Sequence, residues 1–138
     1  MSHHLVLRVI AKLLIPFIML FALYVQFHGD YGPGGGFQAG VIFGSAFILY
    51  ALVFGVEVAC RVAPAWAVRS GIAFGALLYG VTGLVAMQKG GNYLDYSALS
   101  ADPVAGQHLG ILVIELGVGI TVASVMIAIF FGFAGRGR

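Results

Sequence analysis

Hydrophobic positions along the chain form long runs, and polar residues collect in the short segments between them. The runs cover about residues 9–27, 37–56, 68–87 and 109–133. Each is about 20 residues long, and a helix of that length crosses the roughly 30 Å hydrocarbon core of a bilayer. The pattern predicts an all-α integral membrane protein with about four transmembrane helices. No linker divides them, so a single domain over residues 1–138 is expected.

The composition agrees with a lipid environment. Hydrophobic residues make up 61% of the chain and charged residues only 9%, whereas a soluble domain has about 25% charged residues. So few charges cannot coat a water-exposed surface, so the lipid bilayer must be the main solvent. The basic residues do not cluster on one soluble surface, which argues against nucleic-acid binding.

Basic residues are distributed unevenly between the two sides of the predicted helices. All of them except Lys89 lie near the start of the first run, between the second and third runs, or after the fourth: Arg8, Lys12, Arg61, Arg69, Arg136 and Arg138. Basic residues favour the cytoplasmic side. Both termini are therefore predicted to be cytoplasmic, and the glycine-rich connection between helices one and two is predicted to lie outside.

That connection is unusually rich in small residues, reading Gly32-Pro33-Gly34-Gly35-Gly36-Phe37-Gln38-Ala39-Gly40. Glycine at this density lets backbone approach backbone or an ion closely. Gly36, Gly40 and Gly44 recur every four residues and so share one helix stripe, and Gly71 and Gly75 repeat the spacing. The chain has 21 glycines, more than four short helices need to pack together, so contacts with other subunits are predicted. The alternative is that these small residues only pack the four helices of this chain against one another.

Ionisable residues at membrane depth are the sharpest single-residue signals, because burying a charge in a bilayer is costly. Glu115 lies inside the fourth run among aliphatic residues. A structural pair and an ion relay both explain it, and its partner is either Lys89 or a cation from another subunit. Lys12 has two interpretations, an ion-path residue or a side chain that reaches the inner interface. Asp95 lies in an outer connection, where carboxylates concentrate sodium ions or protons at a mouth or simply belong to a polar loop.

Pro16 falls within the first run and removes the backbone hydrogen bond to the carbonyl of Lys12. A kink is predicted there, with a local opening for ions as the alternative.

The chain contains no enzyme motif in the structural context that the motif requires. Gly34–Ala39 matches the dinucleotide pattern G-x-G-x-x-A, but no strand precedes it. The chain has no Cys/His cluster typical of zinc, haem or iron–sulfur centres. We expect no catalytic site, no cofactor and no metal centre.

The run from His28 to Ile42, with Pro33, Gly34, Gly35, Gly36, Phe37 and Gly40, resembles the B subunit (MnhB/MrpB family) of Mrp-type multisubunit sodium/proton antiporters. The resemblance covers nearly the whole chain. It implies a small multi-pass subunit of the bacterial plasma membrane, required for assembly and lining part of the ion path. It also implies other subunits as partners, including large antiporter-like ones, with sodium ions and protons as the transported ions. The motif residues are expected to pack helices and shape an outer vestibule.

Two alternatives remain open. The family also resembles membrane modules of ion-pumping hydrogenase or related respiratory complexes. A stand-alone carrier of the small multidrug type is the third interpretation, but such a carrier needs a carboxylate deep in its first helix. The first run here contains no acid.

Overall fold

The computed structural model describes residues 5–28, 35–92 and 103–134. In these ranges the chain is helical: α1 spans Leu5–His28, α2 Gly36–Phe54, α3 Val56–Val62, α4 Ala65–Gln88 and α5 Pro103–Ala134. All but the short α3 are long and apolar enough to cross a membrane. The prediction of an all-α protein with four transmembrane helices is confirmed.

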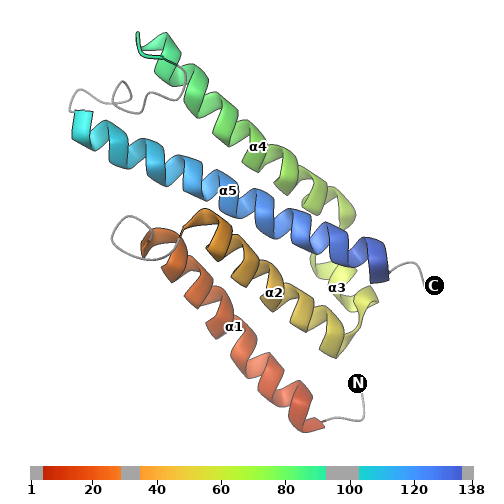
Figure 1. Ribbon diagram of the computed structural model, residues 1–138. Coiled ribbons are helices and arrows are strands. Elements are labelled where there is room, and N and C mark those ends of the chain that lie inside the picture. Colours follow the sequence, from red (N-terminus) through yellow and green to blue (C-terminus); the bar gives the residue numbers. More distant parts are fainter. Residues whose placement is uncertain (1–4, 29–34, 93–102, 135–138) are drawn as a thin grey trace.

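The four long helices lie side by side in a single layer, in the order α1, α2, α5, α4 (Figure 1). Helix α2 packs against α1 on one side and against α5 on the other, and α4 packs on the far side of α5. Successive long helices run in opposite directions, so the first residue of α1 and the last of α5 lie at the same end of the layer (Figure 1).

Two helix boundaries differ from the apolar runs. The fourth run was expected from residue 109, but α5 begins at Pro103, because proline suits the first position of a helix even outside the apolar segment. The second run was expected to reach residue 56, but α2 ends at Phe54, since Gly55 adopts φ +106° and breaks the helix. The chain then turns through α3, where Glu57 in the first turn and Arg61 in the last match the helix dipole.

Small residues occupy the most buried positions between the helices. The most buried apolar residues are alanines, such as Ala46 and Ala51 on α2, Ala59 on α3 and Ala86 on α4. Large apolar side chains point outward on every long helix, including Leu13, Phe17 and Leu77. A layer with an apolar exterior and a small-residue interior is typical of helices packed in lipid, where close backbone contact replaces the hydrophobic driving force.

Candidate functional site

Glu115 and Gly36, which lie far apart in the sequence, meet between α5 and α2. The backbone N–H of Gly36 donates a hydrogen bond to the Glu115 carboxylate oxygen Oε2. Gly36 is the first residue of α2, and the first N–H groups of a helix have no partner within the helix. The carboxylate therefore satisfies one of these groups and lies at the positive end of the helix dipole.

This contact lies at the first residue of α2 but well within α5. Glu115 follows Pro103 by about three helical turns, or about 18 Å along α5. Helix α2 therefore does not begin level with the first residue of α5. Its N-terminal end lies against the side of α5, part of the way along that helix (Figure 1). Glu115 is partly buried there. The step between the two helix starts is what places a carboxylate inside the apolar part of the fold.

The glycines of the motif are required by this contact. Gly35 has φ +153° and ψ −175°, a backbone conformation that is essentially restricted to glycine. A Cβ on Gly35 would lie 2.9 Å from the Glu115 Oε2 atom, and a Cβ on Gly36 would overlap the Glu115 carbonyl oxygen. Glycine at both positions lets the start of α2 rest directly on the backbone of α5.

A buried amide from α1 completes the polar group. Gln26 is 6% exposed, and within residues 5–28, 35–92 and 103–134 its Nε2 atom has no hydrogen-bond partner. Its Oε1 atom lies 2.6 Å from the position that a Cβ on Gly119 would occupy. Gly119 is one turn from Glu115 on the same face of α5. The sequence analysis did not single out Gln26, although it is the single carboxamide in the first apolar run.

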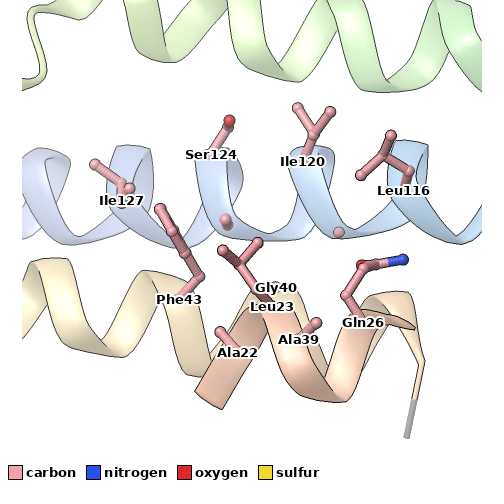
Figure 2. Close-up of a pocket in the computed structure, with 12 residues that line it drawn as sticks. Ala22, Leu23, Gln26, Ala39, Gly40, Phe43, Leu116, Ile120, Ser124 and Ile127 are labelled. Atoms are coloured by element: carbon pink, nitrogen blue, oxygen red, sulfur yellow. The ribbon is translucent and has the colours of Figure 1, made fainter. Parts of the chain in front are cut away.

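Gln26 also lines a cavity of about 310 Å³ formed by α1, α2 and α5 (Figure 2). Its lining is otherwise almost entirely apolar, and small residues from all three helices contribute to it: Ala22, Ala39, Gly40, Gly119 and Ala123. Gln26 and Leu116, the residue after Glu115, lie at the same end of the cavity (Figure 2). On α5 the cavity therefore extends from the level of Glu115 toward the C-terminal end of the helix, as far as Ile127.

The other predicted ion-path residues do not join this group. Lys12 is exposed on α1, about 21 Å along the helix from Gln26. Lys89 is exposed at the C-terminal end of α4. Asp95, Pro33 and Gly34 lie outside the described residues.

The structure places the glycine stripes in contacts within the chain, the alternative interpretation of the sequence, and contacts with other subunits stay a prediction. A Cβ on Gly40 would lie 2.8 Å from the Gly119 carbonyl oxygen and 2.8 Å from Val122 Cβ. Gly44 faces Met126 and Ala123 in the same way. On α4, Gly75 faces the Gly117 carbonyl oxygen of α5 at 2.6 Å, again measured from an added Cβ. Phe37 of the same motif is 61% exposed and points away from these contacts.

Pro16 is exposed within α1, which continues as one helix from Leu5 to His28. The predicted opening for ions at this residue stays a prediction.

Comparison with known proteins gives one consistent result. A family model described as "Domain related to MnhB subunit of Na+/H+ antiporter" matches residues 6–128. Proteins of Staphylococcus aureus strains Newman and JH1, each named "Putative antiporter subunit mnhB2", are 36% identical to this chain over 137 residues. The alignments cover 97% of this chain and 96% of each relative. The chain therefore belongs to the family of domains related to the MnhB subunit of Na⁺/H⁺ antiporters.

Proposed function

We propose that this chain is the small B-type subunit of a multisubunit Na⁺/H⁺ antiporter in a bacterial plasma membrane, and that Glu115 supplies a carboxylate to the ion path. The observation that carries the second part is the contact of the Glu115 carboxylate with the first N–H of α2. The family membership carries the first part. In this proposal the chain is a transporter component that works with large antiporter-like subunits and is required for their assembly.

The position of Glu115 suits a group that binds and releases cations. An acidic side chain inside an apolar span is costly and is rarely kept without a role. The N-terminal end of α2 offers the carboxylate a hydrogen bond and the positive end of the helix dipole. An ionised carboxylate can accept about four hydrogen bonds or ligands, so the bond to Gly36 leaves capacity for a proton, a sodium ion or a water molecule.

A purely structural role for Glu115 is the competing explanation. In that case the side chain only caps α2, and a neutral acceptor of the same shape would serve equally well. Glu115→Gln separates the two roles, because the glutamine carbonyl oxygen still accepts the Gly36 N–H while the ionisable group is lost.

The experiment uses the whole complex in inverted membrane vesicles, with proton movement on addition of sodium chloride as the readout. We expect Glu115→Gln to assemble like the wild type and to lower the antiport rate at least about tenfold, in line with the loss of a proton-transfer group. Glu115→Ala removes the cap as well, so it should also reduce the amount of complex. A wild-type rate in Glu115→Gln would leave the residue with the structural role alone.

The remaining candidates are assigned to the two ends of the path in this proposal. Lys89 lies at the same end of the layer as the start of α5, and Lys12 lies near the opposite end. Asp95 is proposed for the outer mouth.

The parent complex is tested by gentle purification of the tagged chain and mass spectrometry of its partners. Large antiporter-like subunits among them are the expected result. Hydrogenase subunits in their place would move the chain to a redox-driven pump.

A further inference from the structure

The cavity between α1, α2 and α5 has the size and the position of a site for a lipid-soluble molecule. Its volume of about 310 Å³ falls within the roughly 300–1,000 Å³ of ligand pockets. It is also larger than an apolar cavity of about 150 Å³ that binds benzene. Its lining residues all belong to helices that are long and apolar enough to cross a membrane. Lipid, and not water, therefore surrounds it.

The cavity is only partly enclosed. Three of its large lining side chains, Leu23, Phe43 and Leu116, are also partly exposed at the surface of the layer. These side chains border both the cavity and the exterior. A molecule dissolved in the hydrocarbon core can enter between them without crossing water.

The Gln26 carboxamide gives this apolar cavity one polar group. The side chain is 6% exposed. Its Oε1 atom lies 2.6 Å from the position that a Cβ on Gly119 would occupy, and Gly119 itself lines the cavity. In Figure 2 the amide oxygen is on the side of Gly40 and the amide nitrogen on the opposite side. The other polar side chain of the described lining, Ser124, directs its hydroxyl toward Gly71 of α4.

The Oε1 atom is an acceptor without a donor among residues 5–28, 35–92 and 103–134. A carboxamide oxygen has two lone pairs and accepts from O–H or N–H groups. Burying such an acceptor unpaired is unfavourable, and a leucine at this position would line the cavity without that cost. Packing alone therefore does not explain a glutamine here. A ligand with a hydrogen-bond donor does.

We propose that this cavity binds a lipid-soluble molecule with an apolar body and one hydrogen-bond donor, such as an alcohol, whose O–H donates to the Gln26 Oε1 atom. Ala22, Ala39 and Ile120 are among the residues that would contact the apolar body. A charged ligand does not fit, because the lining that the structure describes contains no charged side chain. The site is thus separate from the proposed ion path, and this inference does not rest on the role of Glu115.

Photolabelling of the whole complex in native membranes tests the site. The probe is a diazirine-bearing alkanol, and mass spectrometry identifies the modified residues. We expect modification in the lining segments of α1, α2 and α5. Octanol and its isomer heptyl methyl ether then compete with the probe, since they have the same atoms but only octanol has a donor. We expect octanol to compete at a membrane concentration about two- to tenfold lower, the effect of one hydrogen bond.

Three variants separate the cavity from its polar group. Gln26→Met keeps the approximate size of the side chain but removes the carboxamide oxygen, so labelling should persist and the preference for octanol should disappear. Leu23→Trp adds volume at a partly exposed lining position and should abolish labelling. Leu77→Trp is the matched control, because Leu77 is exposed on α4 and lies outside the lining. It should label like the wild type.

Two results would overturn the inference. If the lining residues stay unlabelled in the whole complex, as when another subunit fills the cavity, the site does not exist. If the ether competes as well as octanol in the wild type, the Gln26 oxygen does not select the ligand. The proposed function is tested apart from both, because Glu115→Gln is assayed by antiport and not by labelling.

A hydroxyl-bearing membrane lipid and a dissolved alcohol offer the same chemistry to this site. Mass spectrometry of the lipids that octanol displaces from the purified complex distinguishes these sources. A hydroxyl-bearing lipid released from the wild type but not from Leu23→Trp would identify the membrane as the source. Labelling without such a release would assign the site to dissolved alcohols.

Discussion

Helix α2 meets α5 in two different ways along its length. In the N-terminal half of α2, named the outer half after the predicted orientation, Gly36, Gly40 and Gly44 bring the two helix backbones into contact. In the inner half, the Phe47 ring packs edge-on against Phe131, with ring centroids 5.8 Å apart and an interplanar angle of 79°, and Ile127 is buried beside them. The α2–α5 interface is therefore formed by backbone contact in one half and by side-chain packing in the other.

The difference explains where the polar site lies. Backbone contact in the outer half leaves peptide N–H and carbonyl groups close to the facing helix, and these groups hold Glu115. The inner half fills the same space with rings and aliphatic side chains, which offer no partner for a carboxylate. Close approach of backbones is thus both a packing device and the source of the polar environment in this layer.

Adding a side chain to the outer half removes the difference between the two halves. This change should have the largest effect on assembly. In Gly40→Leu the new Cβ would lie 2.8 Å from both the Gly119 carbonyl oxygen and Val122 Cβ, so α2 and α5 must separate. Overpacking of this kind costs about 3 kcal/mol or more when backbone is involved. We expect no assembled complex on a native gel. An intact and active complex would show that the backbone contact is not required.

A matched pair on α4 tests whether the contact, and not glycine itself, is what matters. A Cβ on Gly75 would lie 2.6 Å from the Gly117 carbonyl oxygen, whereas a Cβ on Gly80 would meet nothing within 4 Å. We expect Gly75→Ala to destabilise the protein by about 1–3 kcal/mol and Gly80→Ala to change stability by less than about 1 kcal/mol. Thermal unfolding of the detergent-solubilised protein measures both. Equal melting temperatures for the two variants would contradict the assignment.

Removing a ring from the inner half should have a moderate effect. Phe47→Ala deletes a buried ring that contacts Phe131. In soluble cores such changes cost about 3–5 kcal/mol. Here we expect about 1–3 kcal/mol, because lipid tails solvate an apolar surface as well as a protein core does. Phe74→Ala on α4 is the control, since Phe74 is 57% exposed and should tolerate the change in the same melting assay. A loss as large as in soluble cores would mean that this surface borders water.

The sequence was sufficient to predict the helices. It was not sufficient to predict which neighbour each helix face contacts. Four apolar runs of about 20 residues have few alternatives to membrane-spanning helices, and the structure contains those helices. The glycine spacing correctly indicated close helix contact. Spacing marks a stripe but not the neighbour that covers it, and this is why the sequence left contacts within the chain and contacts with other subunits both open, whereas the structure shows that α5 covers the stripes of α2 and α4.

The candidate site was predicted in separate pieces for a similar reason. Glu115 and the glycine-rich motif stand out individually, one by its charge at membrane depth and the other by its composition. Their contact depends on the order of the helices in the layer, which places α5 beside α2, and on the step between the starts of these helices. Neither property follows from local periodicity. Gln26 was missed because a neutral amide near a helix end is ordinary until its burial is known.

The smallest expected effect concerns the inner end of the layer, where a charge meets an aromatic ring in place of a backbone group. The Arg8 guanidinium carbon lies 5.2 Å from the centroid of the Phe54 ring, which joins the start of α1 to the last residue of α2. Such a cation–π contact contributes about 0.5–1 kcal/mol at an exposed site. Arg8→Lys keeps the positive charge that favours the cytoplasmic side but loses the planar group that stacks on the ring. We expect a loss of less than about 1 kcal/mol in thermal unfolding, with membrane orientation unchanged. The same loss in a Phe54→Leu background would show that the ring is not the partner, because a true pair makes the two changes non-additive.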